Sequence, residues 1–165
     1  MIMGVTGSGK TTVGEALARR LGWEFADADD FHSVANKRKI HEGVALTDAD
    51  RAPWLAALHE GVAEWLAGGR DAVLACSALK RAYRRTIAVG GEPRVVYLRG
   101  SYEFIAGRLA QRHGHFAGVS ILASQFEALE EPGDAAVTVE LESPTTGARP
   151  VEEIVNEIVT RLRLA

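Results

Sequence analysis

The chain has 165 residues, of which 47% are hydrophobic and 25% are charged, and its formal net charge is −3. These values are typical of one soluble globular domain, and the lack of a basic excess argues against a nucleic-acid partner. The one cysteine, Cys76, excludes an internal disulfide and is typical of a reducing compartment. No apolar run reaches the roughly 18 residues of a membrane span, and we recognise no signal peptide. We therefore expect a cytoplasmic protein that binds neither a membrane nor nucleic acid.

Strand-like and helix-like segments alternate along the chain. A very short apolar run, residues 1–3, precedes a glycine-rich stretch, and helical spacing then extends from Thr11 to Leu21, where Gly22 is typical of a helix C-terminus. Thr47 is a typical helix N-cap, because its hydroxyl can accept a backbone N–H. Further strand patterns cover 23–28, 72–76, 94–98 and 136–141, and further helical patterns cover the residues after Thr47, 101–112, 120–130 and those after Pro150.

The strand-like segments are apolar on both faces, which is typical of a parallel sheet buried between helices. We therefore predict an α/β fold. No repeat, low-complexity tract or long linker divides the chain, so residues 1–165 are predicted to form a single domain. The segment 113–119 is the most loop-like part of the interior, and we interpret the region around 108–125 as a candidate mobile lid.

The stretch GVTGSGKT, residues 4–11, matches the phosphate-loop pattern G-x-x-x-x-G-K-[ST]. Its glycines let backbone N–H groups turn toward phosphate oxygens, and the following helix adds its positive N-terminal dipole. Lys10 is predicted to bind the β and γ phosphates, and the Thr11 hydroxyl to bind Mg²⁺. A chance glycine-rich turn is not expected between a strand and an amphipathic helix. The predicted nucleotide-binding residues of this loop are Gly4, Thr6, Gly7, Ser8, Gly9, Lys10, Thr11 and Thr12.

Two carboxylates follow the second strand-like segment. Phosphate-loop proteins typically place an aspartate at the end of a buried strand to hold Mg²⁺, yet the strand at 72–76 ends in Cys76. Asp27 and Asp29 are two residues apart, so both would face one side of an extended strand. One would hold the hydrated metal, which we assign to Asp27 with Thr11, and one would orient or deprotonate an acceptor hydroxyl. Which aspartate is the base stays open, and Asp30 is expected in a solvated turn as a helix cap.

A series of motifs resembles the gluconate kinase family in order and spacing: GVTGSGKTT, DADDFH, NKRKIHEG, LTDADRAPWL, CSALKRAYR, VYLRG, RLAQRHGHF and LASQFEALEEP. The resemblance extends from Gly4 to about Pro132, and CSALKRAYR and GHF are not shared by phosphate-loop proteins in general. It implies the three-layer α/β/α sandwich of nucleoside-monophosphate-kinase-like proteins, and a homodimer. It also implies transfer of the γ-phosphate of ATP, with Mg²⁺, to the 6-hydroxyl of D-gluconate.

Gluconate is an anionic polyol, so its site needs cations for the carboxylate and polar groups for the hydroxyls. Lys80 and Arg84 are four residues apart and would be neighbours on one helix face. Arg51 is a third candidate cation, although it could also form a surface ion pair. The predicted acceptor-binding residues are Asp29, His32, Asn36, Arg51, Lys80 and Arg84.

Two further arginines, Arg108 and Arg112, precede the loop-like HGHF segment. A loop that closes over ATP would bring Arg112 to the transferring phosphoryl group and would exclude water. In similar kinases an arginine here stacks on adenine, which the resemblance implies for Arg108, with Pro144 on the other side of the base. The alternative is a solvated helix face. His113 and His115 lack the further ligands that a metal site needs.

Two alternatives remain beside gluconate phosphorylation. A shikimate-kinase-like enzyme typically has three consecutive glycines at its acceptor site and lacks a segment like CSALK. This chain has only Gly68 and Gly69, at a helix end, and it does contain CSALK, so both features argue against that alternative. A non-catalytic nucleotide-binding switch would leave the cations Arg51, Lys80 and Arg84 without a role.

Overall fold

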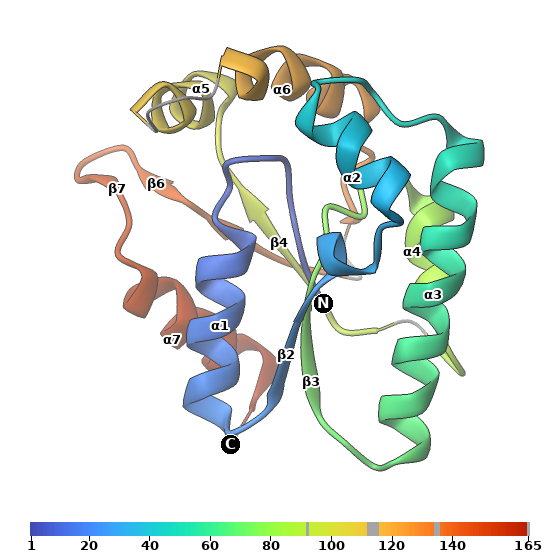
Figure 1. The fold of residues 1–165 in the computed structure, drawn as a ribbon. Coiled ribbons are helices and arrows are strands. Elements are labelled where there is room, and N and C mark those ends of the chain that lie inside the picture. The colour runs from blue at the N-terminus through green and yellow to red at the C-terminus, as the bar shows by residue number, and fades with distance from the viewer. Residues whose placement is uncertain (92, 112–115, 134–135, 165) are drawn as a thin grey trace.

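The computed structural model describes residues 1–91, 93–111, 116–133 and 136–164, and its centre is a five-stranded sheet (Figure 1). Every neighbouring pair of strands is parallel, in the spatial order β2-β3-β1-β4-β5. The carboxyl ends of all five strands therefore lie at one edge of the sheet, where α/β proteins bind ligands. The strands are β1 Ile2–Met3, β2 Glu24–Asp27, β3 Ala72–Ala75, β4 Val95–Arg99 and β5 Ala136–Glu140.

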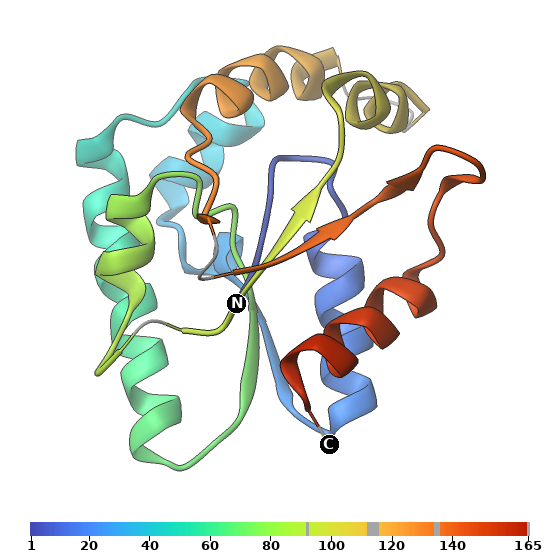
Figure 2. The same cartoon turned by 180° about the vertical axis from the view of Figure 1, so that it is seen from behind.

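Helices cover both faces of this sheet (Figures 1 and 2). One layer contains α1 Lys10–Leu21 and α7 Val151–Leu162, and the opposite layer contains α3 Asp48–Ala67 and α4 Arg81–Ile87. Beyond the carboxyl ends of the strands, at the top of Figure 1, lie α2 Val34–His41, α5 Tyr102–Gln111 and α6 Phe116–Ala128. A small hairpin, β6 Glu142–Ser143 and β7 Gly147–Ala148, follows β5. The predicted parallel α/β class and the three-layer sandwich are both confirmed.

Successive residues of the sheet pack into two separate cores. Val73 and Val96 belong to the core beneath α1 and α7, whereas their neighbours Leu74 and Tyr97 belong to the core beneath α3. Side chains alternate across a strand, and here both sides are covered. This is why the strands are apolar throughout instead of alternating with polar residues.

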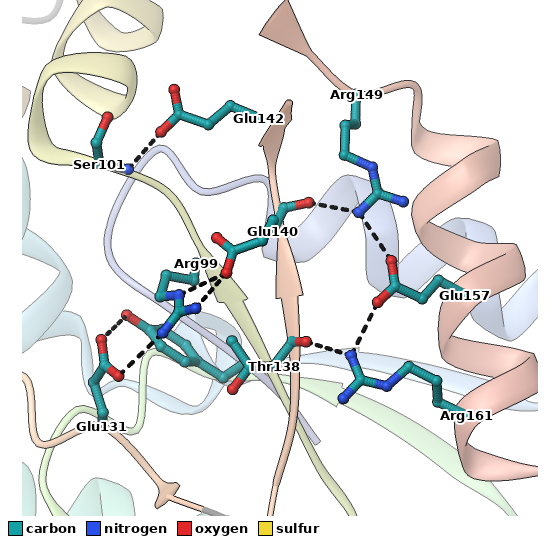
Figure 3. Close-up of polar contacts among 10 residues, drawn as sticks. Arg99, Ser101, Glu131, Thr138, Glu140, Glu142, Arg149, Glu157 and Arg161 are labelled. Carbon is teal, nitrogen blue, oxygen red and sulfur yellow. Dashed lines mark hydrogen bonds and ion pairs between the residues drawn. The ribbon is translucent and has the colours of Figure 1, made fainter. Parts of the chain in front are cut away.

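A polar network ties β4, β5 and α7 together (Figure 3). Arg99, at the end of β4, donates to the Glu140 carboxylate of β5 and lies 3.6 Å from Glu131. Arg149 donates to the backbone carbonyl of Glu140 at 2.9 Å and to the Glu157 carboxylate of α7 at 2.9 Å. Exposed ion pairs contribute little to the free energy of unfolding. We therefore infer that the main effect of this network is to hold the edge strand β5 and the hairpin after it in position.

The first strand is confirmed as very short, with two residues in the middle of the sheet. The structure differs from the predicted elements elsewhere. The loop expected over 113–119 is wrong from residue 116 onward, because α6 begins at Phe116, while 112–115 lie outside the described residues. The helix α2 and the β6–β7 hairpin were not predicted; α2 has the polar sequence VANKRKIH, which shows no apolar period. Among the described helices, none has the length and apolarity that a membrane crossing requires.

Candidate active site

The phosphate loop lies between β1 and α1 and is held by tight packing. Gly7 and Gly9 have left-handed backbone conformations, with φ of 77° and 87°. A Cβ atom on Gly7 would come within 2.8 Å of Leu109 of α5, so a side chain there would be both strained and blocked. Gly9 is the N-cap of α1 and has no side chain that could occupy the first helical N–H groups. The loop therefore presents an open helix N-terminus, which is a favourable site for an anion.

Lys10 folds back over this loop. Its ammonium Nζ donates a hydrogen bond of 3.0 Å to the carbonyl of Val5. Burial lowers the pKa of Lys10, and the carboxylates of Asp29 and Asp27 act in the opposite direction. The Lys10 ammonium thus contacts the loop and is near both aspartates. A phosphate bound to the loop would meet the ammonium there.

The structure brings Thr11 and Asp27 together. The Thr11 hydroxyl donates to Asp27 Oδ2 at 2.7 Å, and hydroxyl and carboxylate oxygens are ligands that suit Mg²⁺, which usually keeps several waters. Within the described parts of the chain, no group of three or more His, Cys, Asp or Glu side chains could hold a metal ion. The pair is therefore compatible with a hydrated cation and not with a cage built from protein ligands alone.

Asp29 lies beside Asp27, but not in the way predicted. The strand ends at Asp27 and a 3₁₀ turn covers Ala28–Phe31, so the two aspartates do not share one face of a strand. Instead the backbone N–H of Asp29 donates to Asp27 Oδ1 at 3.0 Å. Asp29 is exposed by surface area, yet the protein atoms around its carboxyl raise its pKa by desolvation, and the charge of Asp27 adds to this effect. A carboxyl with a raised pKa is a better proton acceptor for a hydroxyl.

The expected role of Asp30 as a helix cap is wrong. The Asp27 carboxylate caps the 3₁₀ turn, and the Ser33 hydroxyl caps α2 by accepting from Asn36 N at 3.2 Å. The backbone carbonyl of Asp30 accepts from Lys37 Nζ at 3.0 Å, and its side chain is exposed.

His32 is buried directly after the aspartates. Its ring stacks on Trp54 of α3 at a centroid distance of 4.5 Å, and the Trp54 indole donates to the Ala28 carbonyl at 2.7 Å. His32 Nδ1 is buried without a hydrogen-bond partner in the described residues. Burial lowers the pKa of His32, as does the nearby charge of Arg51. Because the unpaired Nδ1 is closed to solvent, only the other ring nitrogen of this neutral imidazole, Nε2, could meet a substrate hydroxyl. Trp54 thus positions this ring.

Asn36 has a structural partner. Its side-chain amide donates to the backbone carbonyl of Asp50 at 2.7 Å, and the residue is only 6% exposed. The amide therefore ties α2 to the first turn of α3, which leaves its second N–H and its carbonyl oxygen for a ligand.

The cations Arg51 and Lys80 converge on one carboxylate. Lys80 Nζ lies 3.2 Å from both oxygens of Asp48, and Arg51 Nη1 lies 3.6 Å from Asp48 Oδ1. The Tyr83 hydroxyl also donates to Asp48 Oδ1, and both cations lie over the Tyr83 ring, at 5.7 Å for Arg51 and 5.3 Å for Lys80. Two cations around one carboxylate form a site with a net positive charge, as an anionic acceptor requires.

Arg84 does not join this cluster. Its guanidinium Nη1 donates to the backbone carbonyls of Ala78 and Leu79 at 2.8 and 3.1 Å, and the residue is 9% exposed. The helix α4 begins at Arg81, with Lys80 as its N-cap, so Lys80 and Arg84 are four residues apart but bind different partners. Arg84 holds the segment that carries Lys80.

The predicted adenine-binding residues Arg108 and Pro144 lie on α5 and in the turn of the β6–β7 hairpin, respectively. Arg108 packs on the Phe104 ring at 5.6 Å, and its Nη2 would be 3.5 Å from a Cβ atom on Gly9, so it borders the phosphate loop. Pro144 is exposed in the turn of the β6–β7 hairpin. Figure 3 shows how this hairpin is joined to the start of α5: Ser101 N donates to Glu142 Oε1 at 2.8 Å. Arg112 lies outside the described residues.

Three polar residues of the site were missed in the sequence. Asp48 lies three residues before Arg51, a spacing that could have suggested their ion pair. Tyr83 lies within the CSALKRAYR motif. Gln125 of α6 accepts a hydrogen bond of 2.6 Å from the backbone N–H of Thr6 in the phosphate loop, and nothing in the local sequence predicts this contact, because 119 residues separate the two.

Comparison with known proteins places this site in a family. The shikimate kinase family model matches residues 6–163. A gluconokinase from Gluconobacter oxydans is 49% identical over 135 residues, which cover 81% of this chain and 76% of the relative. A probable gluconokinase from Xenopus tropicalis is 42% identical and covers 99% of this chain and 95% of its own length. The crystal structure of a gluconokinase from Sinorhizobium meliloti superposes with a TM-score of 0.84 at 42% identity, covering 98% of this chain and 89% of that one. The chain therefore belongs to the family of kinases that the shikimate kinase model describes and, within it, to the gluconokinases.

Proposed function

We propose that this protein transfers the γ-phosphoryl group of ATP to the 6-hydroxyl of D-gluconate, giving 6-phospho-D-gluconate and ADP. The observation that carries this proposal is the convergence of Lys10, the Thr11–Asp27 pair and Asp29 at the carboxyl edge of the sheet, with a cationic cluster close by. The gluconokinase relatives support the choice of acceptor.

The donor side of the site is formed by the phosphate loop. Its backbone N–H groups and Lys10 would hold the triphosphate, because both place positive charge against phosphate oxygens. Thr11 and Asp27 would hold Mg²⁺, which neutralises charge on the β and γ phosphates when bound. Arg108 and Arg112 would then contribute to binding of the base and to stabilisation of the transferring group.

The acceptor side is formed by residues of the 3₁₀ turn after β2, of α3 and of the segment before α4. Arg51 and Lys80 would bind the gluconate carboxylate, and His32 would bind a hydroxyl. Asp29 is the better candidate for the base, because Asp27 is occupied by Thr11 and because desolvation raises the pKa of Asp29. As the base, Asp29 would accept the proton of the 6-hydroxyl while the oxygen attacks the γ-phosphorus.

The test is ADP release with Mg²⁺-ATP, measured with D-gluconate, other sugar acids, shikimate and no acceptor. Stimulation by gluconate alone would support the proposal. Stimulation by shikimate alone would favour the second acceptor that the family model suggests, and turnover independent of any acceptor would favour a nucleotide switch.

Two further expectations belong with this proposal. The homodimer implied by the family resemblance stays a prediction, checked by light scattering of the purified chain. The mobile lid around 108–125 also stays a prediction, checked by hydrogen exchange of α5 and α6 with and without Mg²⁺-ATP.

A further inference from the structure

One peptide group of the phosphate loop is held from both sides. The carbonyl of Val5 accepts from Lys10 Nζ at 3.0 Å, and the N–H of Thr6, which belongs to the same peptide bond, donates to Gln125 Oε1 at 2.6 Å. A rotation of this peptide would break both hydrogen bonds at once. The orientation of the Val5 carbonyl, and with it the resting position of the Lys10 ammonium, is therefore linked to a side chain of α6.

Gln125 is itself held in place by the packing of α6. Leu122, one turn earlier, is fully buried in the core beneath α1 and α7. Phe126, the next residue, packs edge-on against Tyr102 of α5 at 5.5 Å. Residues three apart lie on the same side of a helix, so burial of Leu122 directs Gln125 inward toward the loop. In this structure the amide is half-buried and directed toward the loop by the packing of α6.

We propose that Gln125 is a positioning residue for phosphoryl transfer, which holds the Val5–Thr6 peptide so that Lys10 meets the terminal phosphates of ATP. This inference rests on the assignment of the phosphate loop in the proposed function. Lys10 is the loop residue that reaches the β and γ phosphates, and small displacements of such groups cost much of the rate. A glutamine suits the role, because it accepts the N–H without placing negative charge beside the incoming phosphates.

Two substitutions separate the hydrogen bond from the charge. Gln125→Met keeps the size of the side chain and removes the acceptor. Gln125→Glu keeps the acceptor and adds a negative charge at the phosphate end of the loop. The matched control is Ser124→Glu, which places the same charge on the adjacent exposed residue, whose hydroxyl bonds only within α6, to the Ile121 carbonyl at 2.8 Å.

The experiment measures the dissociation constants of Mg²⁺-ATP and Mg²⁺-ADP by calorimetry, turnover with gluconate, and the melting temperature of each variant. For Gln125→Met we expect kcat to fall about tenfold, with ADP affinity and melting temperature nearly unchanged. For Gln125→Glu we expect ATP affinity to weaken roughly tenfold more than ADP affinity, because the added charge opposes the γ-phosphate. Ser124→Glu should leave both affinities near those of the unmodified chain.

The proposal is overturned if Gln125→Glu weakens ATP and ADP equally, if Ser124→Glu reproduces its effect, or if Gln125→Met keeps the full kcat. A failure of the proposed function looks different. If the unmodified chain binds ATP but is not stimulated by gluconate, the acceptor is wrong, and the ATP-to-ADP comparison still decides the role of Gln125. If it binds neither nucleotide, the assignment of the phosphate loop has failed.

Discussion

The Thr11 hydroxyl donates a 2.7 Å hydrogen bond to the carboxylate of Asp27, which joins the first turn of α1 to the end of β2. The sheet order places β3 between β2 and β1, and β3 is followed by Cys76, a buried thiol whose pKa desolvation raises to about 12. That thiol is neutral at physiological pH and is a poor ligand for Mg²⁺. We therefore expect Asp27 to supply the carboxylate that phosphate-loop proteins more often place on the buried strand.

Asp27→Asn should weaken the response to Mg²⁺. Asparagine keeps an oxygen that can accept from Thr11 or from Asp29 N, but it removes the charge that holds a divalent cation. We expect the Mg²⁺ concentration for half-maximal turnover to rise roughly 10- to 100-fold. A magnesium titration of turnover at saturating ATP checks this, and an unchanged titration curve would remove Asp27 from the metal site.

Asp29→Asn should reduce turnover far more than nucleotide binding. Loss of a general base lowers kcat by about 10² to 10⁴, whereas the dissociation constant of ATP should change little. The comparison of kcat with the ATP affinity measured by calorimetry decides whether Asp29 acts as the general base or as a ligand of the metal. Equal losses in both quantities would assign Asp29 to the metal instead.

The pH dependence provides a second check on Asp29. The base acts when it is deprotonated, and desolvation raises its pKa above the usual 3.8. Turnover should therefore fall as the pH falls through this raised pKa, and the acidic limb of the profile should lie above pH 3.8. The limb should be absent from the residual activity of Asp29→Asn; its persistence there would assign it to another group.

Lys10→Ala should remove most of the phosphoryl transfer. The ammonium is expected to lie against the charge that develops on the transferring group, and loss of one such donor costs about 10² to 10³ in kcat. Arg20→Ala is a suitable control, because Arg20 is exposed in the last turn of the same helix, at the end away from the phosphate loop. Substantial turnover by Lys10→Ala in the same assay would contradict the phosphate-loop assignment.

Arg51→Ala should raise the KM for gluconate and spare ATP. A hydrogen bond to a charged group contributes about 1.5–3 kcal/mol, which corresponds to a rise in KM of roughly 10- to 150-fold. Arg81→Ala, at an exposed position of α4, is the control. Gluconate saturation curves at fixed ATP give the answer, and an unchanged curve would restrict Arg51 to its ion pair with Asp48.

Trp54→Phe should destabilise the fold modestly and disturb the acceptor site. Phenylalanine can still stack on His32, but the buried carbonyl of Ala28 loses its donor. Such a loss costs about 1–3 kcal/mol in the free energy of unfolding, measurable by urea denaturation. Trp65→Phe removes a more exposed hydrogen bond, from the Trp65 indole to the Glu24 carboxylate, and should lower the free energy of unfolding by less. A larger decrease for Trp65→Phe than for Trp54→Phe would contradict the importance assigned to Trp54.

Local patterns in the sequence predicted those parts of the site that depend on neighbouring residues. The phosphate loop is one such part, because glycine spacing and an adjoining helix are sufficient to place Lys10 and Thr11. The capping of α3 is another: the Thr47 hydroxyl accepts from Asp50 N at 3.1 Å, and the Asp50 carboxylate accepts from Thr47 N at 2.9 Å, as the spacing of three residues suggests. Asp27 and Asp29 were also found, although the strand geometry used to relate them was wrong.

The class of the fold and the phosphate loop follow from local sequence patterns, since apolar periodicity, glycine conformation and helix caps act over a few residues. The pairing of distant side chains follows from the packing of the whole chain. This packing turned Arg84 toward the Ala78 carbonyl, paired Lys80 with Asp48, stacked His32 on Trp54, and brought Gln125 to the phosphate loop. These contacts depend on the order of the strands and on how each helix packs across the sheet, which no local pattern encodes.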